Sequence, residues 1–375
     1  MEKIDKQTAQ NIWIVSQKLD EKNPFGSGAD AVAKAVKQLG YVQIDTINVI
    51  ERCHHHILFN RIPNYKRSDL EKAQSIDKSI FEYWTHALAY LPVEDFKYCI
   101  KRMKNVDTSP GSWFGSVSRS DYAKVKKLLK EGPLSVRDIK DDELKEKEHE
   151  WDSRKPSKKA LQLGFHRGQL VAARRHGMLK VYDTVERHFD WEIKPKATTD
   201  AEYYDYLIDR TLRSQGVISL DSICHLYPSR KKAVGERIAK KVKNKLLVEA
   251  QIKGLEKIPH WTSPEIIGKR QSESELTHIL SPFDPLVIQR KRLKIFFDYE
   301  HIFEAYVPKA KRKFGYFTLP VLKGNKFIAL LDLKTDRENK ELLIQNWVWL
   351  NKFKSVANKK IIEAELDRFE KFQLG

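Results

Sequence analysis

A glutamine and an aspartate flank one isoleucine in Gln43-Ile44-Asp45, inside a largely apolar stretch that runs from residue 39 to residue 61. In an extended backbone the side chains alternate, so Gln43 and Asp45 would project to one side and Ile44 to the core. An amide and a carboxylate placed side by side could hold one water molecule between them. The same pattern also fits an ordinary strand with one wet face, because short motifs often occur without function.

Three consecutive histidines, His54 to His56, follow Cys53 and raise the question of a metal site. Consecutive residues do not share a helical face, and no second cysteine lies at a usual ligand spacing. We therefore expect no metal here and instead one or two histidines that line a pocket. The sequence also lacks GxGxxG, GxxxxGK(S/T) and GxSxG motifs, and no cofactor is expected.

The segment 81–86 (FEYWTH) combines aromatic rings with a carboxylate and an imidazole. One interpretation is a core helix, since aromatic side chains dominate protein cores. The other is the wall of a pocket in which the rings stack on an extruded nucleobase.

The chain has 375 residues, with 69 Lys and Arg against 51 Asp and Glu, which gives a formal net charge of +18. The 8 Trp, 14 Tyr and 17 Phe argue against disorder, and the 3 Cys argue against a disulfide scaffold. No apolar run is long enough to cross a membrane, and the first residues do not resemble a signal peptide, so a cytoplasmic, nucleoid-associated protein is expected. The positive charge points to nucleic acid, although a basic protein can also be merely soluble.

The pattern of apolar residues predicts helices over 3–20 and 29–39, the second ended by Gly40. The aromatic-rich segment 81–103 is expected to be helical, with an interruption at Pro92. Loop residues dominate 107–120, which suggests a domain boundary.

Two winged-helix modules are expected next, each with three helices and a strand or hairpin. In the first, the helices cover 122–129, a turn capped by Ser135, and 155–165, and the strands are QLVAAR and LKVYD. In the second, they cover 201–215, 219–226 and a helix capped by Ser229 that runs to residue 245, followed by LLVEAQI. This last helix is crowded with Lys and Arg, and only Glu236 interrupts them. That pattern favours DNA contact over a solvated face.

The final third predicts strands at 299–307, 315–322 and 326–333, a hairpin turn at LKGN, the strand ELLIQNWVWL and a closing helix at 358–372. The fold class is therefore α+β, with tandem winged-helix (helix-turn-helix) modules and a C-terminal small β-barrel or antiparallel sheet. The expected domains are an N-terminal winged-helix-like module with the Gln-Ile-Asp motif (1–120), a second winged helix (121–200), a third (201–270) and the β-domain (271–375).

Six segments together resemble the AlkZ/YcaQ family of bacterial DNA glycosylases, in the order expected for that family. They are LGYVQIDTIN with HHHILFNRI, FEYWTHALAYLP, WDSRKPSKKALQLGFHRGQL, LSPFDPLVIQRKRL and YVPKAKRKFGYFTLPVLKGNKFIALLDLKTDR. Gln43-Ile44-Asp45 is similar to the Q-apolar-D motif of the YcaQ branch, whereas the sibling branch has two glutamines.

The resemblance implies a metal-independent, monofunctional DNA glycosylase that removes N7-alkylguanine and unhooks interstrand crosslinks from double-stranded DNA. It implies that Gln43 and Asp45 are catalytic. Residues expected to line the pocket are Thr46, Asn48, His54, His55, Tyr83, Trp84 and His86. Residues expected to bind DNA are Lys155, Lys158, Lys159, Arg230, Lys231, Lys232 and Arg312. The expected oligomeric state is a monomer.

Other readings of the sequence are a winged-helix transcription regulator, a nuclease, and a DNA-binding protein without catalysis. A regulator would prefer one sequence by about 10³-fold or more over random duplex. A nuclease would need carboxylates that hold Mg²⁺ and would be sensitive to EDTA.

Overall fold

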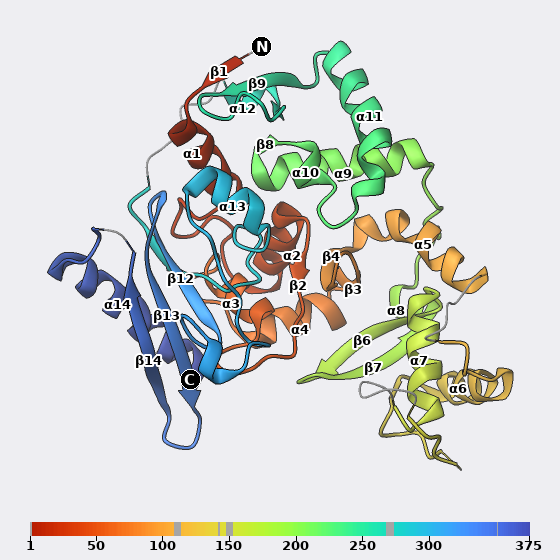
Figure 1. Cartoon of the computed structure of the whole chain (residues 1–375). Coiled ribbons are helices and arrows are strands. Elements are labelled where there is room, and N and C mark those ends of the chain that lie inside the picture. The colour runs from red at the N-terminus through yellow and green to blue at the C-terminus, as the bar shows by residue number, and fades with distance from the viewer. Residues whose placement is uncertain (1, 109–113, 142, 148–152, 268–273, 351) are drawn as a thin grey trace. The chain divides into compact units, whose positions relative to one another are not determined.

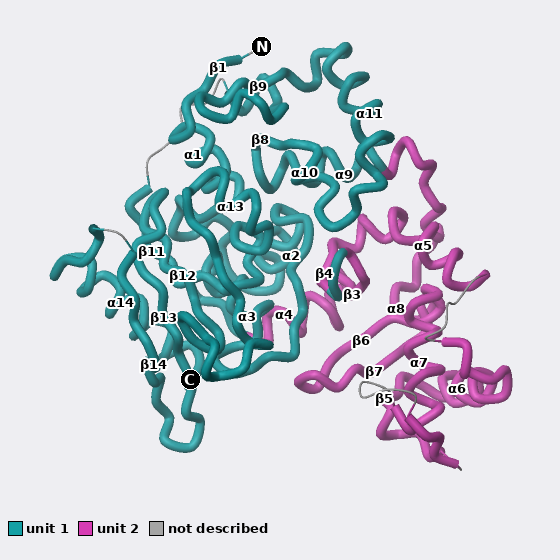
Figure 2. Tube along the Cα trace, viewed as in Figure 1, with its two compact units in different colours: residues 1–66, 86–88, 204–375 teal, residues 67–85, 89–203 magenta. Residues whose placement is uncertain are grey.

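Helices and strands are interspersed along the chain in the computed structural model, which describes residues 2–108, 114–141, 143–147, 153–267, 274–350 and 352–375 (Figure 1). The mixed α+β class expected from the sequence is confirmed. The chain forms two compact units, which are described separately (Figure 2). Unit 1 contains residues 1–66, 86–88 and 204–375, and unit 2 contains residues 67–85 and 89–203. The four-module division is not tested by these units and stays a prediction.

Unit 1 begins with β1 (Glu2–Ile4), α1 (Lys6–Ser16), α2 (Gly28–Leu39), β2 (Val42–Gln43) and α3 (Cys53–Phe59). The helix expected over 3–20 is shorter, because Glu2–Ile4 instead pairs in parallel with residues 250–252. The end of α2 at Gly40 is confirmed: this residue has a φ of 80°, which glycine adopts without the steric cost of a Cβ.

The middle part of unit 1 comprises the end of α9 (Asp200–Gln215), then β8 (Val217–Ile218), α10 (Leu220–Ile223), α11 (Lys231–Lys243), β9 (Val248–Ile252), β10 (Trp261–Thr262) and α12 (Pro264–Ile267). Strands β1, β9, β10 and β8 form one sheet in that order. Two expectations are wrong here. The second helix is a single turn rather than 219–226, and Ser229 lies in a 3-10 turn, so α11 starts without a side-chain cap.

The C-terminal part of unit 1 is an antiparallel sheet in the order β11 (Thr277–Ile279), β12 (Thr318–Lys323), β13 (Lys326–Asp336) and β14 (Glu341–Trp349), drawn in blue tones in Figure 1. It is an open sheet, since β11 and β14 each pair with one neighbour. The hairpin at Gly324 and the closing helix α14 (Val356–Leu374), which buries Ile362, Leu366 and Phe369, are confirmed.

The strand expected at 299–307 does not form. The carboxylate of Glu304 turns inward and accepts the backbone N–H groups of Lys313, Phe314 and Gly315, so this segment is an irregular loop. The preceding helix α13 (Arg290–Phe297) packs its buried face into the main core of unit 1, around Trp13, Leu293 and Phe296.

Unit 2 contains α4 (Arg67–Ser75), β3 (Ile80–Trp84), most of β4 (Leu88–Pro92), α5 (Phe96–Thr108), α6 (Arg119–Glu131), β5 (Leu134–Ser135), α7 (Pro156–His166), β6 (Leu170–His176), β7 (Leu179–Thr184) and α8 (Val185–Phe189). The helices α6 and α7 and the hairpin of β6 and β7 are confirmed, and β5, β7 and β6 form one sheet in that order.

Two expectations fail in unit 2. The segment 81–103 is not one helix: its first part forms β3 and β4, and α5 begins only at Phe96. Pro92 explains part of this, because proline favours an extended conformation in the residue before it. Ser135 closes a turn instead of starting a helix, since its hydroxyl accepts from the Arg137 amide and donates to Asp138. The expected loop and boundary at 107–120 lies partly outside the described residues.

Candidate active site and nucleic-acid interface

Gln43 ends the short strand β2, where the Ile44 amide donates to the Leu88 carbonyl at 2.8 Å. The expected alternation would expose Gln43 and bury Ile44, but both are buried, with exposed fractions of 6% and 5%. The Gln43 side chain contacts another residue inside the protein: its Oε1 lies 3.1 Å from Nε2 of His86. The structure therefore brings together two of the residues expected in the site.

His86 is neutral at pH 7, because burial, assisted by His225 and Arg210, lowers its pKa to about 4. Its ring centroid lies 5.1 Å from that of Tyr41 and 5.9 Å from that of His225. The phenol of Tyr41 stays protonated, since burial raises its pKa to about 12.

Sequence reasoning missed Tyr41, His225 and Arg210. Tyr41 could have been found, because it precedes Gln43 by two residues and so shares its face of an extended backbone. Arg210 lies over the Tyr41 ring at 5.8 Å and comes from α9, so no local signal identifies it. The same is true of His225.

Asp45 is half-buried, and its carboxylate accepts the backbone N–H of Ile47 at 2.8 Å. A short side chain that accepts from the amide two residues later forms a turn of its own, and this turn fixes the carboxylate. Cys53 lies beside both residues: its Sγ donates to the Gln43 carbonyl at 3.1 Å. Burial and the charge of Asp45 raise the pKa of the Cys53 thiol, so it stays protonated.

The remaining unit 1 candidates differ in surroundings. Thr46 is exposed, and Asn48 accepts from Arg337 at 3.1 Å. The rings of His54 and His55 lie 4.4 Å apart, and Nδ1 of His55 is 2.6 Å from the Tyr65 hydroxyl. The described ranges contain no group of three or more His, Cys, Asp or Glu side chains that could hold a metal ion.

Tyr83 and Trp84 belong to unit 2. The Tyr83 hydroxyl donates to the His166 carbonyl at 2.7 Å, and Trp84 stacks on the His166 ring at 5.6 Å. Beside them, the Glu82 carboxylate is buried. Burial by itself raises the pKa of this group, but Lys180 and Arg175 outweigh that effect and lower the pKa to about 2. Tyr83 and Glu82 thus pack in the core of unit 2, which agrees with the core interpretation of FEYWTH. The two residues lie on a strand, however, and not on the expected helix.

The basic residues expected to bind DNA are not equivalent. Lys158 and Lys232 are exposed, and Lys155 is half-buried. Lys159 is only 7% exposed and donates to Ser116 at 2.9 Å, so it is unavailable to a phosphate in this conformation. Arg230 lies over the Tyr227 ring at 3.9 Å.

Two of these residues are held by contacts with neighbours. Lys231 pairs with Asp221, and Arg312 donates to the Val307 carbonyl at 2.8 Å while it lies over Tyr316 at 4.8 Å.

Carboxylates balance more of the positive charge of helix α11 than its sequence indicates. Arg237 pairs with Asp205, and Lys241 pairs with Asp209 at 2.7 Å, both from α9. The carboxylates that balance this helix therefore come from another helix, 32 residues earlier in the chain in both pairs.

No helix in the described part of the chain is long and apolar enough to cross a bilayer.

The family described as DNA glycosylase AlkZ-like matches residues 36–372 of this chain. Among solved structures, the chain is similar to the Streptomyces sahachiroi DNA glycosylase AlkZ, with 14% sequence identity and a TM-score of 0.62. The similarity covers 100% of this chain and 97% of the other, and at this identity it shows a shared fold. Because the family match extends over most of its length, this chain belongs to the AlkZ-like DNA glycosylase family.

Proposed function

We propose that this protein hydrolyses the N-glycosidic bond of N7-alkylguanine in double-stranded DNA, and that its substrates include bulky monoadducts and interstrand crosslinks. The proposal places it in the YcaQ branch, because Gln43-Ile44-Asp45 has the Q-apolar-D pattern. Asp45 acts as the general base and stabilises the sugar cation, and Gln43 positions the attacking water.

The chemistry suits this pair of side chains. Alkylation at N7 gives guanine a positive charge, so the bond from C1′ to N9 breaks readily and the base leaves as a neutral molecule. The sugar develops oxocarbenium character, which a nearby carboxylate stabilises. Asp45 then takes a proton from the water whose oxygen bonds to C1′, and general-base catalysis of this kind contributes about 10²–10⁴-fold.

The observation that carries the proposal is the hydrogen bond between Gln43 and His86 next to a carboxylate fixed by the Ile47 amide. A neutral His86 that carries its proton on Nε2 donates to Oε1 of Gln43. In this proposal the second lone pair of that oxygen accepts a hydrogen bond from the attacking water. The amide orientation is thus set before substrate binds, which is the preorganisation that positioning groups require.

Duplex binding in this proposal is electrostatic and independent of sequence. The winged-helix modules supply Lys155, Lys158, Arg230 and Lys232 to phosphates, whose contacts fix position without reading bases. A base tethered to the opposite strand cannot enter a tight flipping pocket, so the site must accept the lesion with little or no extrusion, unlike enzymes that flip the base fully.

The test is an excision assay on duplexes that contain N7-methylguanine, a nitrogen-mustard monoadduct or an interstrand crosslink. Wild-type protein releases the base and leaves an abasic site in the presence of EDTA. Asp45→Asn lowers the rate about 100-fold or more, and Gln43→Ala lowers it by a smaller factor. Asp30→Asn removes an exposed carboxylate of α2 that pairs with Lys34, and it serves as the control with wild-type activity.

If Asp45→Asn and Gln43→Ala bind duplex and excise at the wild-type rate, the assignment of the two residues is wrong. If the wild-type protein binds duplex but releases no base from any substrate, a DNA-binding or regulatory role without catalysis replaces this proposal.

A further inference from the structure

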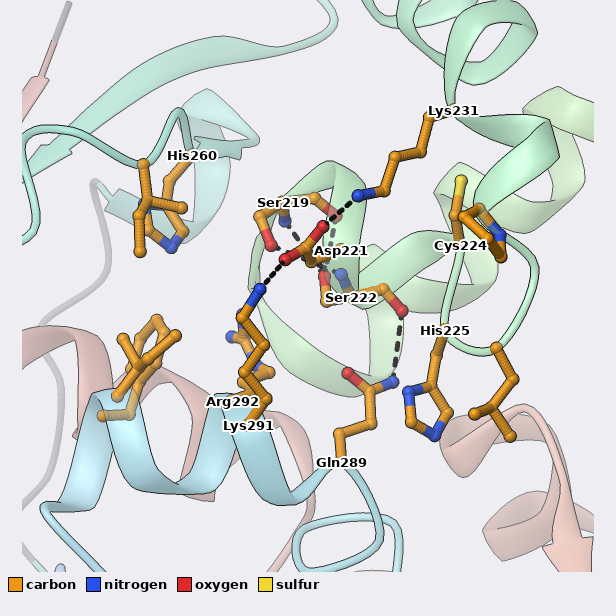
Figure 3. Close-up of a pocket in the computed structure, with 15 residues that line it drawn as sticks. Ser219, Asp221, Ser222, Cys224, His225, Lys231, His260, Gln289, Lys291 and Arg292 are labelled. Carbon is orange, nitrogen blue, oxygen red and sulfur yellow. Dashed lines mark hydrogen bonds and ion pairs between the residues drawn. The ribbon is translucent and has the colours of Figure 1, made fainter.

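A cavity of about 270 Å³ lies within unit 1, between α10, the loop that follows it, and α13 (Figure 3). It adjoins the site described above through His225, whose ring neighbours that of His86. Its wall is mostly apolar. The apolar side chains that line it are Leu226, Pro228, Ile258, Ile295 and Phe296.

Arg292 lines this cavity and is 6% exposed. A guanidinium group has several N–H donors and keeps its charge in proteins. Here Nη2 donates to the Val217 carbonyl at 2.6 Å, whereas Nε and Nη1 have no hydrogen-bond partner among the described residues. The group is flanked by two aromatic rings, with Trp13 at 4.3 Å and Phe296 at 4.2 Å.

No carboxylate in the described part of the chain lowers the cost of burying the charge of Arg292. Burial alone lowers its pKa, to about 9, and no charged group in the described residues acts against that effect. Among the described residues that line the cavity, Asp221 is the carboxylate, and it already binds both Lys231 and Lys291, as the dashed lines in Figure 3 show. The cavity therefore contains an excess of positive charge.

The two histidines of the cavity do not change this balance. Burial and the nearby Arg292 lower the pKa of His260 to about 4, and burial and Arg290 lower that of His225. Neither ring supplies an anion. A buried cation with open donors in an apolar wall is costly unless an anion pairs with it.

We propose that this cavity binds a small organic anion, with a carboxylate or phosphate group on Arg292 and an apolar body against Ile258, Ile295 and Phe296. The volume is slightly below the usual range for drug-sized ligands, about 300–1,000 Å³, which suits a body the size of a single ring. Lys231 and Lys291 increase the local concentration of such anions. Arg292 lies in LSPFDPLVIQRKRL, a segment to which the proposed catalysis gives no role.

Isothermal titration of the full-length protein tests this with four probes. They are benzoate, phenyl phosphate, inorganic phosphate and benzyl alcohol. Benzoate and phenyl phosphate bind, benzyl alcohol binds at least tenfold more weakly because it lacks the charge, and inorganic phosphate binds more weakly because it lacks the ring. Arg292→Met reduces the affinity for benzoate tenfold or more. Lys294→Met serves as the matched control with unchanged affinity, since this exposed lysine of α13 pairs with Glu300 and does not line the cavity.

Equal binding of benzoate and benzyl alcohol, or unchanged binding by Arg292→Met, overturns the proposal. If Arg292→Met does not fold, the double variant Lys231→Met with Lys291→Met replaces it, and its benzoate affinity is expected to fall severalfold. Affinity equal to wild type in that variant also overturns the proposal.

Saturating undamaged duplex distinguishes a free anion from a DNA phosphate. Retained benzoate binding supports a separate small-molecule site, and loss of it overturns that site in favour of a DNA phosphate. The readout is binding heat, so the result is independent of whether the protein excises any base.

Discussion

Gln43 and Asp45 are held by different contacts, and the difference separates their proposed roles. Gln43 is buried and contacts His86, so its amide is fixed by a residue 43 positions away in the sequence. Asp45 is fixed locally, by the Ile47 amide, and remains partly accessible. A buried amide that orients water and an accessible carboxylate that reacts with it fit this arrangement.

His86→Phe should keep the ring and remove the contact with Gln43. We expect the excision rate constant to fall by roughly fivefold, since one hydrogen bond contributes about 1 kcal/mol, while the duplex Kd is unchanged. Single-turnover kinetics and a binding titration separate the two effects. The control is His176→Phe, which changes an exposed histidine of unit 2.

The pH dependence of the excision rate provides a second test of the role of His86. Because its pKa is lowered to about 4, His86 is neutral from pH 5 to 8 and should add no inflection there. An inflection near pH 6.5 that disappears in His86→Phe would show that the imidazole titrates in the working range, against this assignment.

One residue of the LSPFDP segment, Asp284, forms a buried ion pair. Arg61 and Asp284 have no exposed surface and contact each other through two nitrogens at 2.8 and 3.0 Å. Arg61 also donates to the Gln17 carbonyl, and Asp284 accepts from the Leu286 amide. This pair joins the end of α3 to the segment before α13, within unit 1.

Arg61→Met should lower the free energy of unfolding by about 3–5 kcal/mol, because it leaves the Asp284 carboxylate buried without its partner. Lys6→Met breaks the exposed pair with Asp298 and should cost at most about 1 kcal/mol. Denaturant titrations of both variants measure the difference. Equal losses in the two variants would mean that burial does not decide the strength of these pairs.

At the scale of elements, α11 presents two kinds of cation. Arg237 and Lys241 are paired with α9 and stabilise the packing of the two helices. Lys232 is exposed near the start of α11, after Arg230 in the preceding turn, so these two are the better candidates for phosphate contact.

Replacing both Arg230 and Lys232 by alanine should weaken binding to any duplex. It should also reduce the slope of log K against log salt concentration by about 2, or roughly 1 per phosphate contact. Lys34→Ala on α2 is the control with an unchanged slope. Fluorescence anisotropy at several salt concentrations gives the slopes. A slope unaffected by the double variant would remove α11 from the DNA interface.

At the scale of the molecule, many histidines are buried. Burial lowers the pKa of His56, His86, His166, His188, His260 and His278 to about 4, and that of His301 to about 3. In the unfolded chain these rings titrate near 6.5, so between about pH 6.5 and 4 the unfolded state binds more protons than the native one.

The free energy of unfolding should therefore fall steadily as the pH is lowered from 6.5 to 4. Urea midpoints at pH 7, 6, 5 and 4 measure this. A midpoint that stays constant to pH 4 would show that these rings are protonated in the folded protein.

The sequence alone determined the elements whose signals are local. Gly40 ended α2, the hairpins of β6 with β7 and β12 with β13 formed at their glycine turns, and α14 buried its apolar stripe. The positive charge and the resemblance in motif order pointed to the glycosylase family, which the family match then showed. The helix end, the hairpins and the apolar stripe depend on residues close to each other in the sequence. The family resemblance depends on motifs that are visible in the sequence itself.

Tertiary structure decided what depends on distant partners. The segment 81–103 became strands and a helix, Gln43 was buried against His86, and Lys159 turned inward to Ser116. The balance of charge on α11 and the surroundings of Arg292, whose Nε and Nη1 have no hydrogen-bond partner among the described residues, likewise depend on segments far apart in the chain. The physical reason is that burial and electrostatics act through space, so a pattern in one segment cannot specify which groups another segment brings to it.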